Sequence, residues 1–428
     1  MPPVEPQHTP ISAKAPAPFW TAVSLSVLAA LVFVGLAHFA NLSDWIRAPD
    51  AWSYDWRTAH FARQPAKVRD DITVITIDEA SLERYTSVSP VSRGLQAKLV
   101  AALEQAGAKA IGLDFVYDRA TTPEDDAALV QALKSAKIPI VIGALDSRAA
   151  LRDRDKDIGL GYQETFIAET GKNAGHLYFF GSGDQGRFVI GDQVIRNRIG
   201  PSPRPPYLVS FAEALAQSVG ATGKSSEPAA SGTPTKPRLI DWQRPPASGL
   251  DRDPVSLLQV TPHKPGAAIS EMFGKGWDAQ VRGRIVLIGG SFGDRDRHLT
   301  PFSVIDRSKM PGVLVHAQIL AQLIDGREVR TVPVVIEAVL LVAVALIAWR
   351  LASSSWSVPL LSWVRIRPDA GGVVETFVTG VVVFVAGVII YAATGFIFPS
   401  ATFFLAVMTG LLLGNPPGWV ACCADRFR

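Results

Sequence analysis

The run DITVITI at 71–77 is the first of three short apolar runs that indicate the fold class. It is short and rich in β-branched residues, which is typical of a buried strand. Two similar runs follow, KAIGLD at 109–114 and IPIVIG at 138–143, and segments with helical spacing of apolar residues separate them at 95–106 and 123–137. The order strand, helix, strand, helix, strand with short links predicts a parallel sheet covered by helices.

Residues at the helix ends support these positions. Gly107 directly follows the first helix, where a left-handed C-cap is expected. Thr122 precedes the second helix as its expected N-cap, Pro123 occupies the first helical position, and acidic residues follow in the first turn.

Beyond residue 143 the alternation breaks. Residues 161–197 read as β-rich and irregular, and the small, polar, Pro-rich stretch 221–237 predicts a surface loop. Further elements are expected as helices at 207–219 and 312–323 and as strands at 238–242 and 284–289. The fold class is therefore predicted as α/β, with a mixed, mostly parallel sheet that carries insertions.

Both ends of the chain are unusually apolar. Charged residues make up 19% of the sequence, whereas soluble globular chains carry about 25%. A membrane span needs about 20 apolar residues in a helix. Four transmembrane helices are predicted, at 19–41, 332–350, 372–393 and 396–414. This organisation excludes a purely cytosolic enzyme and a many-pass transporter without a large domain.

The positions of Arg residues predict the orientation of these spans. Basic loops stay on the cytoplasmic side, and Arg350, Arg365, Arg367, Arg426 and Arg428 follow the second and fourth spans. The expected arrangement has cytoplasmic tails at 1–18 and 415–428, a cytoplasmic loop at 351–371 and an extracytoplasmic domain at 42–331. The lipid bilayer is then a partner of the chain.

Two features of the expected spans concern single residues. Glu337 lies within about one or two turns of a span end, so it is expected to reach the interface rather than to act inside the membrane. Gly410 and Gly414 form a GxxxG pair, which permits close contact between helices.

Charge and cysteine content limit the classes of function. The net charge of +3 is too small to favour nucleic acid as a partner. Cys422 and Cys423, the only cysteines, are adjacent and can form neither a disulfide framework nor a zinc site. Neither a catalytic constellation nor a cofactor motif is found, so no enzymatic activity, cofactor or metal is expected. His316 lies on an apolar helix face and is expected to be a hydrogen-bonded core histidine.

Polar residues gather where the predicted strands end. The carboxyl ends of parallel strands meet at one edge of a sheet, where ligands bind. The candidate ligand-binding residues are Asp78, Arg93, Asp114, Asp118, Ser291, Asp294, Arg295 and Asp296. They could hold a small anionic or zwitterionic ligand, or the acids could hold a cation such as Ca²⁺. They could also simply cap helices and pair with arginines.

Several local patterns occur in an order that resembles one family. They are YDWR at 54–57, the strand at 72–78 followed by SPVSR at 89–93, AKAIGLDF at 108–115, GRIVLIG at 283–289, Thr300-Pro301 and PGVLVHA at 311–317. Together with the membrane frame, these patterns resemble the CHASE2 family of bacterial extracytoplasmic sensor domains. The resemblance implies a multi-pass protein of the bacterial inner membrane with a periplasmic central domain.

The resemblance also implies a role in signalling. Members of the family commonly continue into a cytoplasmic cyclase or kinase domain, but only about 14 residues follow Gly414 here. We therefore expect a sensor or receptor that binds an external signal or protein and couples through its transmembrane helices to a separate membrane or cytoplasmic signalling protein. The alternative is a structural subunit of a multimeric envelope complex or filament, in which edge strands in 161–197 pair between copies. A homo-oligomer is expected in both cases.

Overall fold

The structure of the chain is a computed structural model. It describes residues 18–38, 44–85, 89–145, 153–179, 194–198, 209–221, 238–246, 254–293, 297–353, 371–394, 396–397 and 399–414. The chain divides into two compact units. One is Asp55–Val329, and the other combines Met1–Tyr54 with Arg330–Arg428.

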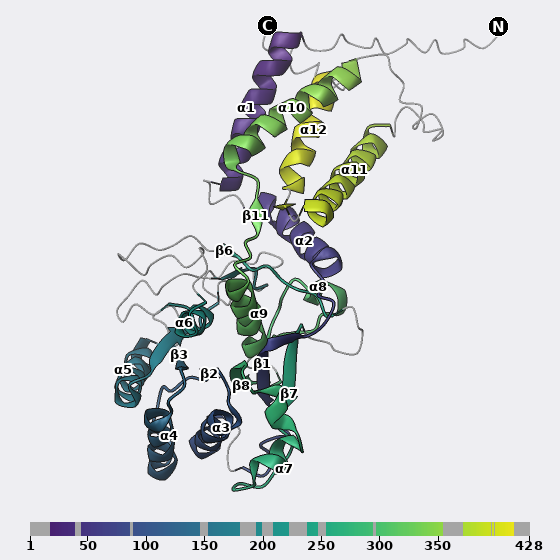
Figure 1. The fold of residues 1–428 in the computed structure, drawn as a ribbon. Helices are drawn as coiled ribbons and strands as arrows, with labels where there is room; N and C mark the ends of the chain where they lie inside the picture. The colour runs from purple at the N-terminus through teal and green to yellow at the C-terminus, as the bar shows by residue number, and fades with distance from the viewer. Residues whose placement is uncertain are drawn as a thin grey trace, which may run out of the picture. The chain divides into compact units, whose positions relative to one another are not determined.

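A six-stranded sheet forms the centre of the Asp55–Val329 unit (Figure 1), in the order β4-β3-β2-β8-β1-β7. Its strands are β1 (Arg69–Ile77), β2 (Ala110–Asp114), β3 (Ile140–Ala144), β4 (Asn173–His176), β7 (Val255–Gln259) and β8 (Ile285–Gly290). Every neighbouring pair in this sheet is parallel. The prediction of an α/β fold with a mostly parallel sheet is confirmed, but the six-stranded sheet is not mixed, because all its strand pairs are parallel. The edge strand β7 was not predicted.

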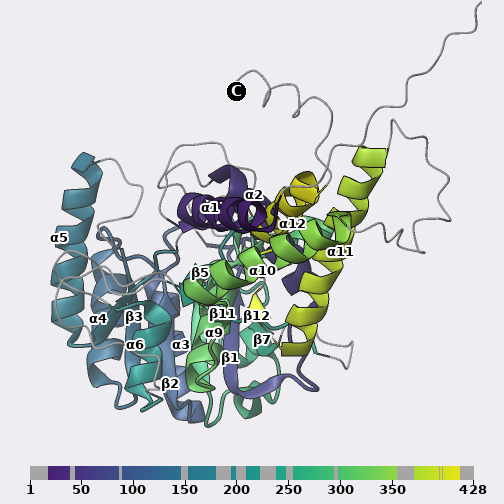
Figure 2. The same cartoon turned by 90° about the horizontal axis from the view of Figure 1, so that it is seen from above.

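One face of the sheet is covered by the helical elements that follow β1, β2, β3 and β7. These elements are α3 (Arg93–Ala106), α4 (Pro123–Ser135), α5 (Asp153–Thr170), α7 (Ile269–Phe273) and the 3-10 turn η2 (Trp277–Gln280). Ile75, Leu113 and Ile288 of the strands pack here against helix residues such as Leu99 and Leu129. Figure 2 shows α3 and α4 beside the sheet in a second view.

The opposite face is covered by α6 (Phe211–Ser218) and α9 (Gly312–Ile324). Successive side chains of a strand alternate between faces, so Val74 and Leu287 point into this second core with Phe211 and Leu320. The backbone of α6 comes very close to β4 here, because a Cβ on Gly175 would lie 2.5 Å from the Cα of Phe211.

Shorter elements complete this unit. They are the C-terminal part of α2 (Asp44–Phe61), β5 (Asn197–Arg198), β6 (Arg238–Leu239), β9 (Arg297–His298), α8 (Ser303–Asp306) and β10 (Met310–Pro311). Strands β5 and β6 form an antiparallel pair, as do β9 and β10.

The expected helix caps are confirmed at one of two positions. Gly107 ends α3 in the left-handed conformation with φ 86°. Thr122 stands at the N-cap position of α4, but its side chain makes no capping hydrogen bond.

The prediction of a β-rich stretch at 161–197 is wrong for much of its length. Helix α5 continues to Thr170, and only β4 and β5 within the described part of the stretch are strands. Tyr162 and Phe166 are one helical turn apart and pack together on the core, which fixes this segment as a helix. The loop expected at 221–237 lies outside the described residues except for Ala221.

The other unit consists mainly of apolar helices. They are α1 (Phe19–His38), the start of α2, α10 (Val334–Ser353), α11 (Gly371–Thr394) and α12 (Ser400–Gly414), with the short parallel pair β11 (Arg330–Thr331) and β12 (Phe396–Ile397). Helices α1, α10 and α12 share a small core that includes Val34, Leu341 and Phe403. Gly410 allows α12 to approach α10 closely, as its GxxxG pattern suggested, because a Cβ there would lie 2.0 Å from the carbonyl oxygen of Ala345.

The four predicted transmembrane helices at 19–41, 332–350, 372–393 and 396–414 need correction. Within the described part of the chain, no helix has both the length and the apolarity that a membrane crossing requires. Such a crossing needs about 20 consecutive apolar residues, and α12 has 15 residues because 396–397 form a strand instead.

Glu337 does not reach the surface as expected. It is 3% exposed, and the hydroxyl of Thr402 lies 3.4 Å from its Oε1. A carboxyl group is therefore enclosed where α10 and α12 pack together.

Candidate functional site

The residues predicted for one site at the carboxyl edge of the sheet fall into separate surroundings. Asp78 follows β1 and accepts hydrogen bonds from the Ser81 amide at 2.8 Å and the Ser81 hydroxyl at 2.6 Å. The side-chain amide of Gln259 donates a third bond of 2.6 Å. Asp78 thus closes the turn after β1 and joins it to the end of β7, which is a structural task.

Arg93 is buried at the start of α3, between helices on one face of the sheet. Its guanidinium group pairs with Asp126 at 2.8 Å and donates to the Tyr162 hydroxyl at 2.9 Å and to the carbonyl of Arg119. Burial works against the charge of Asp126, but bonds from Thr121 and the charge of Arg93 lower its pKa.

Three aromatic rings surround the same guanidinium group. Its central carbon lies 5.0 Å from the ring centre of Phe166, 5.4 Å from that of Tyr117 and 5.6 Å from that of Tyr162. Such cation–π contacts stabilise a desolvated cation. Arg93 is therefore an internal anchor of α3, α4 and α5 rather than a group presented to a ligand.

The remaining predicted residues do not assemble around a ligand either. Asp118 pairs with the exposed Arg119 at 3.1 Å. The amide of Ser291 donates to the carbonyl of Ile77 at 2.8 Å, which extends the ladder between β8 and β1. Asp294, Arg295 and Asp296 lie outside the described residues.

Asp114 differs from these residues because it ends β2 on the other face, opposite α9. Its Oδ1 lies 4.0 Å from Nε2 of His316, and their side chains are 7% and 3% exposed. The imidazole of His316 also packs against two aromatic rings, with centre distances of 4.4 Å to Phe179 and 5.1 Å to Phe211. His316 is in the core as expected, but its Nδ1 has no hydrogen-bond partner within the described structure.

Two more histidines belong to these surroundings. His176 is the last residue of β4 and is fully buried, and His298 of β9 packs edge-on against Phe179 at 5.1 Å. Both are close enough to influence the charge of His316. We call Asp114, His176, His298 and His316 the carboxyl-end cluster.

Burial lowers the pKa of two imidazoles of this cluster. It lowers the pKa of His316 well below its ordinary value of 6.5, and repulsion from His176 and His298 adds to the effect. Burial, followed by the charge of Lys309, also lowers the pKa of His298. A neutral imidazole offers one donor and one acceptor, and the lowered pKa leaves His316 in this form beside Asp114 at neutral pH.

The Ca²⁺ alternative gains no support from this geometry. Among the residues that the structure describes, no group of three or more histidine, cysteine or acidic side chains is placed to hold a metal ion. Of the predicted site residues that the structure describes, Asp114 alone belongs to the cluster. His176 was missed because it lies in the stretch predicted as irregular.

Comparison with known proteins adds the family of the chain. The model of a family described as the CHASE2 domain matches residues 27–352. The match covers most of the chain and confirms the resemblance seen in the sequence. CHASE2 is an extracytoplasmic sensor domain. Neither the curated proteins nor the solved structures contain a match to this chain.

Proposed function

The chain belongs to the CHASE2 family, and from this premise we propose that it binds an external signal and passes the effect to a separate partner protein. The match to a sensor domain over 27–352 is the observation that carries the proposal. The whole Asp55–Val329 unit falls inside that match.

The carboxyl-end cluster is the proposed place where the signal acts. In open parallel sheets, ligands bind beyond the carboxyl ends of the strands, and two members of the cluster, Asp114 and His176, end such strands. Buried ionisable groups with shifted pKa values are also candidates for functional sites. The lowered pKa of His316, caused first by burial, fits this description.

The chemistry of the cluster favours a small zwitterionic ligand. A carboxylate such as that of Asp114 can accept from an ammonium group, and a neutral imidazole can donate to a carboxylate. The rings of Phe179 and Phe211 beside His316 supply apolar surface. Binding sites for small molecules commonly combine apolar walls with a few polar groups.

The test is a thermal-shift screen of the full chain against amino acids, dicarboxylates and phosphorylated sugars. We expect amino acids to raise the Tm of the wild type by several degrees and to have little effect on Asp114→Asn. Asp118→Asn is the matched control, because it makes the same chemical change at the exposed pair with Arg119. It should keep the wild-type response.

Two results would contradict the proposal. One is that none of the three compound classes shifts the Tm of the wild type, and the other is that Asp114→Asn responds as the wild type does. The partner is tested by cross-linking in the native host with and without the active compound. Cross-links to a signalling protein that change with the compound support coupling, whereas ordered multimers of this chain alone favour an assembly subunit.

A further inference from the structure

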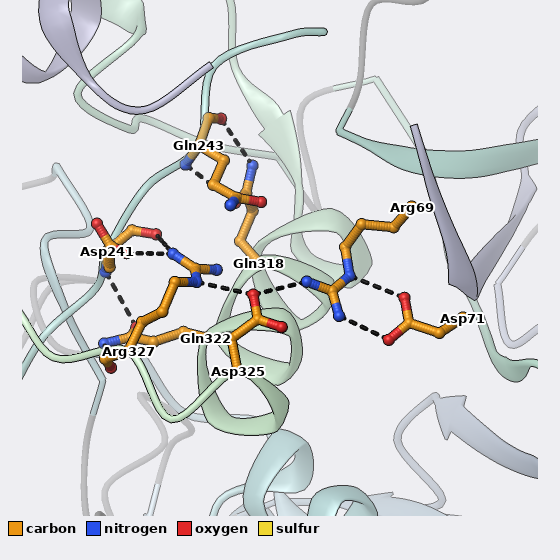
Figure 3. A network of polar contacts seen from close by, with 8 residues as sticks. All are labelled: Arg69, Asp71, Asp241, Gln243, Gln318, Gln322, Asp325 and Arg327. Carbon is orange, nitrogen blue, oxygen red and sulfur yellow. Dashed lines mark hydrogen bonds and ion pairs between the residues drawn. The ribbon is translucent and has the colours of Figure 1, made fainter. Parts of the chain in front are cut away.

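Two glutamines of α9 hold an extended segment at 239–244 by its backbone. Gln322 donates to the carbonyl of Leu239 at 3.2 Å and accepts from the amide of Asp241 at 3.0 Å. Gln318, one turn earlier, accepts from the amide of Gln243 at 3.2 Å and donates to its carbonyl at 3.1 Å. Figure 3 shows these side chains between α9 and the segment. The side-chain amides of the two glutamines thus form the backbone hydrogen bonds that a neighbouring strand would form with every second residue.

Charged groups extend this connection to the end of α9. Arg327 donates to the carbonyl of Asp241 at 3.0 Å and also pairs with its carboxylate. The Nε of Arg327 donates to Asp325 at 2.9 Å, and the same oxygen of Asp325 accepts from Arg69 at 2.7 Å. The segment, the end of α9 and the start of β1 therefore form one polar network (Figure 3).

Ile240 and Arg244 of the segment, which the glutamines do not hold, bond to other parts of the chain. The amide of Ile240 donates to the carbonyl of Arg196 at 2.8 Å, and Arg196 pairs through its side chain with Asp55 at 2.6 Å. The amide of Arg244 donates to the carbonyl of Arg63 at 2.9 Å, and its guanidinium group donates to the carbonyl of His60. These bonds tie the segment to the C-terminal part of α2.

Two buried side chains fix the segment in the second core. Ile240 and Trp242 are 0% and 1% exposed, and Trp242 packs edge-on against Phe302 at 5.9 Å. Because protein cores are close-packed, we expect a segment with two buried side chains to shift as a rigid unit more readily than it deforms.

We propose that 239–244 is a coupling strip that makes the two ends of the Asp55–Val329 unit move together. The chain enters this unit at Asp55 and leaves it after Val329. The strip is bonded near both places, through Arg196 and Arg244 on one side and through Arg327 on the other.

The energetics of the Asp55–Arg196 pair agree with a positioning role. Burial raises the pKa of Asp55, although the hydrogen bond and charge of Arg196 oppose this shift. Removing two charges from water costs about as much as their attraction returns, so a buried pair adds little net stability. What it does provide is a defined geometry between α2 and the residues that bond to the strip.

Use of the strip in signalling rests on the proposed function, but the coupling itself does not. Coupling between distant residues has to be shown by measuring both ends. The measurement below uses no ligand, so its failure leaves the ligand screen unaffected, and failure of the screen leaves the coupling standing.

The test is hydrogen–deuterium exchange of the full chain carrying Gln318→Leu and Gln322→Leu. We expect exchange to become about tenfold faster in 55–63 as well as in 325–329, although neither glutamine bonds to α2. Gln163→Leu is the matched control, because this buried glutamine bonds in the same way to the backbone of Leu145, at 2.6 and 3.1 Å. It should leave 55–63 unchanged.

Faster exchange that stops at the strip and α9, or an equal effect of the control, would overturn the proposal. If the double leucine variant does not fold, Asp55→Asn and Arg327→Lys are compared singly and together. Coupling predicts that the exchange rate of 325–329 in the double variant departs about threefold or more from the product of the single effects. Effects that simply multiply would overturn the proposal in that form as well.

Discussion

Arg69 and Asp325 are 256 positions apart in the sequence and are joined by a hydrogen bond of 2.7 Å between Nη1 and Oδ2. Arg69 begins β1, and Asp325 is the C-cap residue of α9. A carboxylate at a helix C-terminus is unfavourable, because this end of the helix is already negative. Burial adds to that cost, but Arg69 and then Arg327 outweigh it and lower the pKa of Asp325.

We predict that Asp325→Asn destabilises the protein by roughly 1–2 kcal/mol, a value that allows for partial screening by solvent. The substitution removes the negative charge that two arginines share while it keeps the size of the side chain. Its contribution should be present above the ordinary pKa of 3.8 and should be lost as the pH falls through the lower value in the folded state. Chemical denaturation at neutral and acidic pH measures both effects.

Asp70→Asn is the control for this prediction. Asp70 pairs with Lys67 at 3.0 Å, and both side chains are exposed. Surface pairs of this kind contribute little, so the midpoint of unfolding should stay the same. If Asp70→Asn lowers the free energy of unfolding as much as Asp325→Asn does, the network around Asp325 contributes no more than an exposed ion pair.

Gly175→Ala should be strongly destabilising, by about 1–3 kcal/mol. The added Cβ would lie 2.5 Å from the Cα and 2.8 Å from the amide nitrogen of Phe211. These are backbone atoms, so α6 would have to move away from β4. Thermal unfolding measures the loss, and an unchanged Tm would mean that α6 does not pack on the sheet as described.

Gly161→Ala is the matched control and should have the opposite sign. Gly161 lies inside α5, and nothing stands within 4 Å of the position of an added Cβ. Alanine is favoured over glycine in a helix interior by up to about 1 kcal/mol. The same chemical change should therefore stabilise one site and destabilise the other.

The sequence was sufficient for the elements near residue 71 but not for the order of the strands. Strands β1, β2 and β3 were predicted because each has its own apolar run and a clear helix between it and the next. The position of β8 between β1 and β2 depends on pairing between residues far apart in the sequence, such as Ile72 with Ile285. Strand β7 was missed because Val255–Gln259 contains two polar residues and its exposed Leu257 breaks the pattern of a buried run.

The candidate site could be predicted only in part, because alternation along a strand separates neighbouring side chains but does not tell which helix covers which face. Leu113 points into the core with α3, and its neighbour Asp114 points to α9 on the opposite face. Arg93 belongs to the first of these faces. The predicted site residues were all expected near strand ends, but the structure places them on opposite faces of the sheet. His316 lies on a helix face that was predicted to be apolar, but the residues that it contacts in the cluster were not predicted.

Gly410→Ala should loosen the packing of α12 on α10. The added Cβ would lie 2.0 Å from the carbonyl oxygen and 2.8 Å from the Cβ of residues 345 and 348, respectively. We expect a loss of about 1–3 kcal/mol and easier proteolysis near α12. Gly35→Ala in α1, where an added Cβ meets nothing within 4 Å, should be neutral or slightly stabilising. Equal effects of the two substitutions would argue against a close contact between α10 and α12.

His316 should make the protein lose stability on acidification. Burial, assisted by His176 and His298, lowers its pKa well below 6.5 in the folded state. The unfolded chain then binds a proton more readily than the folded chain once the pH falls below 6.5. The contribution of the neutral His316 imidazole to the free energy of unfolding is therefore fully present above that pH. Below it, the free energy of unfolding decreases by up to about 1.4 kcal/mol for each pH unit.

His316→Phe should remove this part of the acid dependence while it keeps a ring between Phe179 and Phe211. Chemical denaturation at a series of pH values should give a shallower loss of stability below pH 6.5 for the variant than for the wild type. His263→Phe is the control, because the ring nitrogens of His263 are bonded to Thr261 at 2.8 Å and to Tyr85 at 2.9 Å. That variant loses stability overall but still contains His316, so its decline should stay as steep as that of the wild type. Parallel declines for His316→Phe and the wild type would mean that the buried imidazole is not the group that responds to acid.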